Sequence, residues 1–211
     1  MNKHKYLTNT YIDSETMEEM IGKFKNHSAR VLVNDENYFI INWQNGDLLE
    51  YQVRYVLDRK RGTLSISGDF GDGIAKWYGE MEPVKLARLM NDAYYFATKL
   101  TCYTDLYTQE SASIKEDLKD LFEELWRENP DGQMREDWYS FAGDILNLDP
   151  ELLEIYPLGA PYSITSFARE YGIDDDAMST LGIRMDGRVA LWALGFQMAV
   201  EQLTDSAALT A

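Results

Sequence analysis

The sequence is poor in the residues that build most catalytic and metal sites. Its 211 residues include one cysteine, Cys102, and two histidines, His4 and His27. A single cysteine excludes a disulfide framework within the chain and a cluster of thiolate ligands for zinc. Neither histidine lies in a Ser-His-Asp, Cys-His or HExxH pattern. The composition therefore predicts no catalytic residue, no metal ligand and no cofactor, and it favours a reducing, cytoplasmic setting.

Long apolar runs are also missing. No stretch approaches the roughly 20 apolar residues that a membrane-spanning helix needs. The start, MNKHKYLTNTYIDSE, lacks the apolar segment of a secretory signal. Hydrophobic residues nevertheless make up 45% of the chain and aromatic residues 13%, which is enough for a substantial core. We therefore expect a globular protein that does not enter membranes.

Basic residues are few relative to acidic ones, and the deficit is uneven. The net charge is −16; residues 1–110 carry 16 acids and 13 bases, whereas residues 111–211 carry 20 acids and 7 bases. Phosphate binding needs cations, so direct binding of free DNA or RNA is not expected. A host protein with a basic groove is a suitable partner, because opposite potentials steer association. Acidity that serves only solubility is the simpler alternative.

The first half of the chain shows the pattern of a helix followed by antiparallel strands. Apolar residues in DSETMEEMIGKFKN recur at helical spacing, and the runs ARVLV and NYFIINW are typical of strands. Asn45-Gly46 is a strong signal for a two-residue hairpin. From Tyr51 to Leu57, apolar and polar residues mostly alternate, which indicates a strand with one buried face. An antiparallel β-meander is therefore expected.

Helical patterns dominate the rest of the sequence. Pro83 suits the first turn of a helix expected to run to about residue 100, and Ser113 with Glu116 forms a capping box for another helix. The last helix, from 186 to 203, is apolar nearly all round, which places it centrally. The fold class is therefore α+β: a small antiparallel meander packed against helices, with a mostly helical, acidic C-terminal half. We expect two regions, 1–110 and 111–211, packed into one fold.

The stretch SISGDFGDGIAKWYG, residues 65–79, is rich in glycine and aspartate. It does not match a P-loop, an EF-hand or the kinase motif set, so its DFG triplet is coincidental. Gly68, Gly71 and Gly73 would supply positive φ for a turn or bulge. Asp69 and Asp72 would cap local amides. A weaker hypothesis is that these two aspartates bind a divalent ion.

Three segments together resemble a known kind of protein. They are SISGDFGD with IAKWYG, the aromatic segment YYFATKL with Cys102 nearby, and the final helix RVALWALGFQMAVEQL. This combination resembles an uncharacterised family of accessory proteins from phages and integrative elements of low-GC Gram-positive bacteria, over roughly two-thirds of the chain. The resemblance implies a gene product that inhibits host defence, of the anti-CRISPR type. It implies no catalytic residues.

Two groups of residues are candidates for partner binding. The helix after Ser113 carries carboxylates on the face opposite its apolar stripe, and these could imitate a row of phosphates, although a merely solvated helix face has the same pattern. Asp174, Asp175 and Asp176 could bind a basic partner, with helix capping as the favoured alternative. The carboxylates of the helix are Glu116, Asp117, Asp120, Glu123 and Glu124.

Tyrosines flank Cys102 on both sides. Packing against the sheet is the favoured interpretation of this aromatic cluster, because large aromatic side chains dominate cores. The alternative is a tyrosine-rich surface for a partner, carried by Tyr103 and Tyr107.

The sequence thus predicts a phage or mobile-element inhibitor that acts in the host bacterial cytoplasm. It would bind a CRISPR effector nuclease and block its nucleic-acid groove by acidic mimicry. A metal-dependent nuclease that cleaves guide RNA through Asp69 and Asp72 is one alternative. A module that binds a host protein unrelated to CRISPR is another.

Overall fold

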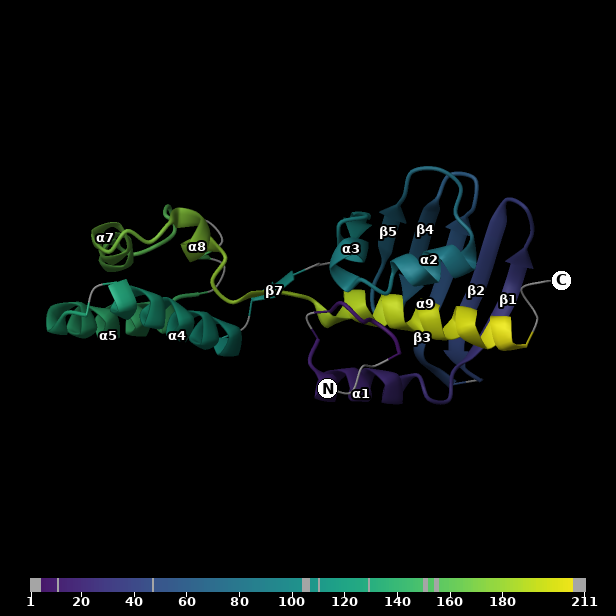
Figure 1. The fold of residues 1–211 in the computed structure, drawn as a ribbon, viewed down its shortest axis with the longest axis horizontal. Helices are drawn as coiled ribbons and strands as arrows, with labels where there is room; N and C mark the ends of the chain where they lie inside the picture. The colour runs from purple at the N-terminus through teal and green to yellow at the C-terminus, as the bar shows by residue number, and fades with distance from the viewer. Residues whose placement is uncertain are drawn as a thin grey trace. The chain divides into compact units, whose positions relative to one another are not determined.

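The structure, a computed structural model, describes residues 5–10, 12–46, 48–103, 107–109, 111–128, 130–149, 152–153 and 156–206. The chain forms two compact units (Figure 1): unit 1 consists of Met1–Leu106 with Asp186–Ala211, and unit 2 of Tyr107–Met185. The α+β prediction is confirmed, with an antiparallel meander first and helices predominating afterwards. The last helix belongs to unit 1, so the units differ from the regions expected on either side of residue 110. That these regions pack into one fold stays a prediction.

Unit 1 is built on a six-stranded antiparallel sheet in which each strand pairs with the next. The predicted hairpin between β2 and β3 is present, but its turn lies one residue later than Asn45-Gly46 indicated, because Asn45 still belongs to β2 and pairs with Leu48. Alternation along β3 buries Val53, Tyr55 and Leu57 on one face. The strands are β1 (Ser28–Asn34), β2 (Tyr38–Asn45), β3 (Leu48–Asp58), β4 (Thr63–Gly68), β5 (Gly73–Lys76) and β6 (Leu100–Tyr103).

The last helix, α9 (Gly187–Asp205), crosses one face of this sheet (Figure 1) and contacts β1, β2 and β3. Its Trp192 and Phe196 are buried, and the Tyr55 hydroxyl donates a hydrogen bond to the Trp192 carbonyl oxygen at 2.9 Å. The helix α1 (Ser14–Lys23) lies beside the N-terminal part of α9, where Met20 meets Gly187. The prediction of a central final helix is confirmed by burial on all sides.

The helix expected from Pro83 to about residue 100 is wrong as a single element. The structure has α2 (Pro83–Leu89), then α3 (Ala93–Ala97), and then strand β6. The break occurs because the Asp92 carboxylate accepts a hydrogen bond from the Tyr95 amide at 2.7 Å and caps a new helix. Both short helices pack against α9.

The glycine-rich stretch forms the end of β4 and the start of β5. Gly68 and Gly71 have φ of 146° and 81°, so the predicted positive φ is confirmed there. For Gly73 the prediction is wrong: its φ is not positive, and its small size instead admits the Trp192 ring, 3.0 Å from the position of an added Cβ. The Asp69 carboxylate accepts a hydrogen bond from the Gln52 amide at 2.9 Å; this amide belongs to the neighbouring strand β3 and not, as expected from the sequence, to the local turn.

Gly68→Ala is expected to destabilise unit 1 by about 1–3 kcal/mol, the usual range for a strained backbone. An added Cβ at Gly68 would lie 2.1 Å from the Gln52 carbonyl oxygen, and both atoms belong to paired strands. Chemical denaturation with urea measures the difference. Gly22→Ala is the matched control: nothing lies within 4 Å of its Cβ in α1, so this change should stabilise the protein slightly. Equal stabilities of the two variants would contradict the strain at Gly68.

Unit 2 has its own hydrophobic core, formed by helices. Strands β7 (Tyr107–Gln109) and β8 (Ile183–Met185) are the first and last segments of the unit in the sequence, and they pair with each other antiparallel. Phe167 stacks on Phe141 with ring centroids 4.3 Å apart, and Trp138 contacts both rings. The helices are α4 (Ser111–Glu128), α5 (Gly132–Asn147), α7 (Tyr162–Glu170) and α8 (Asp175–Ser179).

The outer edge of the sheet, at β1, is partly occupied by a side chain of α9. The Ala29 amide donates a hydrogen bond to the Gln202 side-chain oxygen at 2.7 Å, and the strand carries an irregularity between Val31 and Val33.

Among the described helices, none combines the length and the apolar character that a membrane span requires.

Candidate functional site

Helix α4 separates its apolar and acidic residues onto opposite sides. Ile114, Leu118 and Leu125 are buried in the core of unit 2. The other side is exposed and carries most of the candidate carboxylates. This arrangement results directly from helical periodicity, since residues three and four positions apart share a face. The exposed acids are Glu116, Asp120, Glu123, Glu124 and Glu128.

The exposed carboxylates form a continuous strip along α4. At about 100° per residue, Glu116, Asp120, Glu123 and Glu124 fall within a sector roughly 100° wide. Lys115 and Lys119 fall on one flank of that sector, and Arg127 falls inside it. From 116 to 128 the helix rises about 18 Å. The five acids of this face thus lie about 4.5 Å apart on average along the axis, compared with ~3.4 Å per phosphate along one DNA strand.

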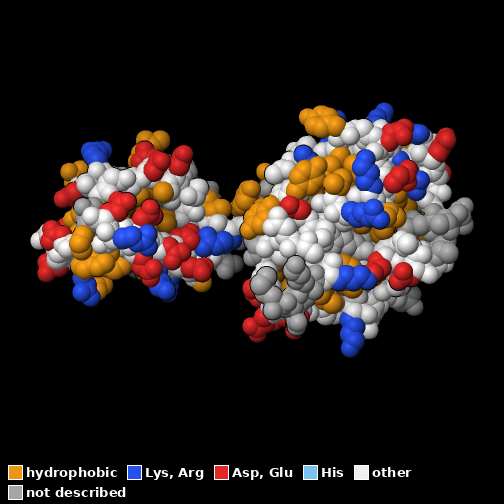
Figure 2. Space-filling view, viewed as in Figure 1, with side chains coloured by type: hydrophobic (Ala, Val, Ile, Leu, Met, Phe, Trp, Pro, Cys, Tyr) orange, Lys and Arg blue, Asp and Glu red, His pale blue; other side chains and the backbone are white. Residues whose placement is uncertain are grey.

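The wider surface of unit 2 is acidic too. Residues 107–185 carry 18 acids and 6 bases, a net charge of −12, and Figure 2 shows acidic side chains spread over the visible face of this unit. Among the described residues, no ion pair involves Asp120, Glu123 or Glu124. Their charges are therefore available to a cationic partner.

Asp117 stands apart from the other candidates because its carboxylate is already engaged. It pairs with the Arg184 guanidinium at 2.6 Å and accepts a hydrogen bond from the Gly182 amide at 2.7 Å. Burial alone would raise the pKa of the Asp117 carboxyl, but the hydrogen bonds from Arg184 and Gly182 outweigh it and hold this pKa below its usual value. Arg184 also approaches Glu116 at 3.4 Å. Asp117 therefore joins α4 to β8 and to Gly182, the residue before it.

The three consecutive aspartates form the start of α8. The Asp174 carboxylate accepts a hydrogen bond from the Asp176 amide at 3.1 Å, so Asp174 is an N-cap, as the favoured interpretation had it. Asp175 and Asp176 occupy the first turn, where their charges suit the positive end of the helix dipole. All three side chains are exposed. Partner binding by these residues stays a prediction.

The interpretation of the tyrosines near Cys102 as core residues is wrong. Tyr103 in β6 and Tyr107 in β7 are exposed to 45% and 53%, and Cys102 is also exposed. Of the YYFATKL segment, Phe96 is the aromatic residue that enters the core, where it stacks on Trp77. Each exposed tyrosine is thus available for contact with a partner. Tyr103 lies in unit 1 and Tyr107 in unit 2.

The enzymatic alternative depends on Asp69 and Asp72. Asp69 holds the Gln52 amide, whereas no hydrogen bond of Asp72 is recorded among the described residues. His27 is buried beside Phe24 and Trp43, and burial lowers its pKa. Within the described ranges, no group of three His, Cys, Asp or Glu side chains is arranged to hold a metal ion. The nuclease hypothesis thus gains no second ligand group around Asp69.

Glu128 follows Glu124 by four residues and extends the acidic face, as its spacing in the sequence indicates. One part of the acidic site escaped the sequence-based prediction. The pairing of Asp117 with Arg184, 67 positions later in the chain, carries no local signal.

Comparison with known proteins identified no relative of this chain. No protein-family model matches the chain, and neither a curated protein nor a solved structure is significantly similar to it.

Proposed function

We propose that this protein is an inhibitor that binds a basic, nucleic-acid-binding groove of a host protein through the acidic face of α4. The carrying observation is the strip of exposed carboxylates on an ordered helix of a unit with net charge −12; among the described residues, its members Asp120, Glu123 and Glu124 take part in no ion pair. A rigid helix presents charges at fixed spacing, so the partner's cations need not order them on binding.

The density of charge favours mimicry over a general solubility role. A mean spacing of ~4.5 Å along the helix axis approaches the ~3.4 Å phosphate spacing of a single strand. A groove lined with Lys and Arg would gain from replacing phosphates by these carboxylates, because association between opposite potentials is fast and selective. Free nucleic acid, by contrast, is repelled by the same surface.

The partner in this proposal is a CRISPR effector nuclease of the bacterial host, and the protein acts in the host cytoplasm. The resemblance of the glycine-rich stretch and the final helix to accessory proteins of mobile elements supports this choice. The basic channel of such an effector is the kind of surface that the α4 strip complements.

The test is inhibition of target-DNA cleavage by the host's guide-loaded effector. Wild type is expected to inhibit, whereas Asp120→Lys/Glu123→Lys/Glu124→Lys should bind about 10–100-fold more weakly. Glu15→Lys/Glu18→Lys/Glu19→Lys is the matched control, because it changes net charge equally on the exposed face of α1. Binding of wild type should also weaken as salt rises from about 50 to 500 mM, since the screening length becomes shorter than the interface.

Two outcomes would contradict the proposal. One is a folded α4 variant that binds and inhibits as well as wild type. The other is an equal loss of binding in the α1 control variant. That result would show that the effect depends on net charge alone and not on the position of the charges. Guide RNA recovered after incubation with Mg²⁺ distinguishes the enzymatic alternative: shortened guide RNA with wild-type protein, abolished by Asp69→Asn, would favour cleavage over mimicry.

A further inference from the structure

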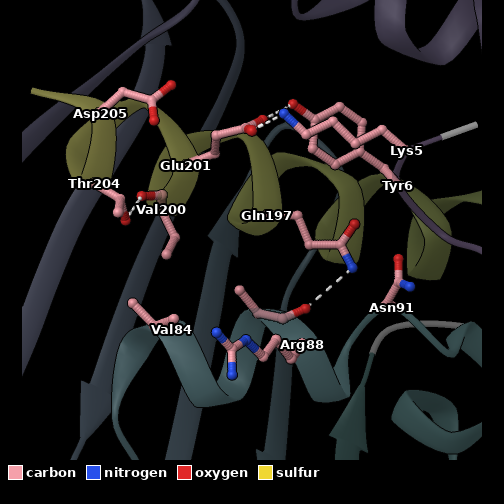
Figure 3. A pocket seen from close by; sticks show the side chains of 11 residues that line it. Lys5, Tyr6, Val84, Arg88, Asn91, Gln197, Val200, Glu201, Thr204 and Asp205 are labelled. Carbon is pink, nitrogen blue, oxygen red and sulfur yellow. Dashed lines mark hydrogen bonds and ion pairs between the residues drawn. The ribbon is translucent and has the colours of Figure 1, made fainter.

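Unit 1 contains a hollow between α2, α9 and residues 5–6, with a volume of about 440 Å³. Figure 3 shows α9 forming one wall and α2 the other. Apolar side chains of Val84, Ala87 and Val200 line it. Its volume lies within the usual range of small-molecule sites, about 300–1,000 Å³. The hollow lies outside unit 2, so a ligand bound in it would be independent of the proposed function of α4.

One polar side chain of the lining, that of Gln197, is buried. Gln197 is 6% exposed, and its Nε2 donates a hydrogen bond to the Ala87 carbonyl oxygen at 3.2 Å. Its Oε1 is buried without a hydrogen-bond partner among the described residues. An unsatisfied buried acceptor is costly, by about 1–3 kcal/mol. Because the terminal torsion of glutamine is soft, rotation of the amide would turn Oε1 toward a donor in the hollow, with the bond from Nε2 to Ala87 exchanged for the new one.

The rim of the hollow carries opposite charges on its two walls. Arg88 projects from α2 and Asp205 from α9 (Figure 3). Neither side chain takes part in an ion pair recorded among the described residues. The third charge of the rim, Glu201, is instead neutralised, because Lys5 pairs with it and the Tyr6 hydroxyl donates to it.

We propose that this hollow binds a small zwitterion with an apolar body and an internal N–H group, of which a hydrophobic dipeptide is the simplest example. Its amino group pairs with Asp205 and its carboxylate with Arg88. Its amide N–H donates to Gln197 Oε1, and its aliphatic side chains pack against Val84 and Val200. Each polar group that the hollow leaves without a partner thereby receives one of matching chemistry.

Isothermal titration with the dipeptide Leu-Leu tests this assignment on the full chain. Three altered probes each remove one matched group: N-acetyl-Leu-Leu the cation, Leu-Leu amide the anion, and the ester analogue the internal N–H. Each alteration is expected to weaken binding to wild type by about tenfold or more. Arg88→Gln should weaken Leu-Leu binding similarly but leave the affinity for Leu-Leu amide unchanged. Asp205→Asn should also weaken Leu-Leu binding but leave the affinity for N-acetyl-Leu-Leu unchanged.

Lys85→Gln, on α2 but outside the hollow, and Glu18→Gln, on α1, are control variants that should bind Leu-Leu like wild type. The proposal is overturned if Leu-Leu does not bind at millimolar concentration. It is equally overturned if Arg88→Gln and Asp205→Asn bind all four probes with wild-type preferences. Binding of the ester analogue as tightly as Leu-Leu would remove Gln197 from the recognition and with it the argument for an internal N–H.

Discussion

Trp192→Ala is expected to lower the free energy of unfolding of unit 1 by about 3–5 kcal/mol, the usual cost of emptying a large aromatic site. Trp192 is 1% exposed and lies where α9 meets the sheet, against Gly73. Gly73 has no side chain to move into the vacated space, and Leu100 is the nearby side chain that could fill only part of it. For a unit of this size the loss corresponds to a fall in Tm of roughly 10–20 °C. Thermal melts followed by circular dichroism measure it.

Tyr78→Ala is the matched control for this prediction. Tyr78 is fully exposed, so its truncation should change stability by less than about 0.5 kcal/mol. If Trp192→Ala melted within a few degrees of Tyr78→Ala, α9 would not be the centre of the unit 1 core.

Phe167→Ala is expected to disrupt unit 2, at a cost of about 3–5 kcal/mol. Its ring contacts Trp138, Phe141 and Tyr171, with centroids 5.9, 4.3 and 4.5 Å away. A unit of 79 residues has a small free energy of unfolding, so this loss is a large fraction of that free energy. Hydrogen exchange should show lost protection in α4 and α5, and binding to a basic groove should fall because the carboxylates of α4 lose their fixed spacing.

Tyr162→Ala, also on α7, provides the comparison because Tyr162 is 82% exposed. It should leave exchange in α4 and α5 unchanged. The strands of unit 1 should keep their protection in both variants, since their core contains none of these rings. Wild-type protection of α4 in Phe167→Ala would show that the ring cluster does not hold unit 2 together.

Elements with strong local patterns were predictable from the sequence, and those set by distant contacts were not. The alternation in β3 correctly identified Val53, Tyr55 and Leu57, but it also placed Tyr51 on the buried face. Tyr51 instead has a φ of 59° and is 39% exposed, because the pairing of β2 with β3 shifts after Trp43. A bulge of this kind leaves the alternation of residue types intact, so the sequence does not reveal it.

The same division applies to the candidate site. The strip on α4 depends on residues three and four positions apart, so the sequence predicted both its acids and its exposure. The removal of Asp117 from that strip depends on Arg184, which only the fold brings close. The burial expected for Tyr103 and Tyr107 rested on side-chain type alone. Strand β6, which contains Tyr103, has four residues, and β7, which contains Tyr107, has three, too few for a periodic pattern.

The hydrogen bond from Ala29 to Gln202 has a consequence for self-association. An outer strand normally offers free amides and carbonyls to which the strand of another molecule can add. In this protein a side chain of the last helix already occupies one of those amides, and the irregularity between Val31 and Val33 bends the same strand a little further along. The sheet therefore resists templated extension into fibrils at β1, even where concentration is high.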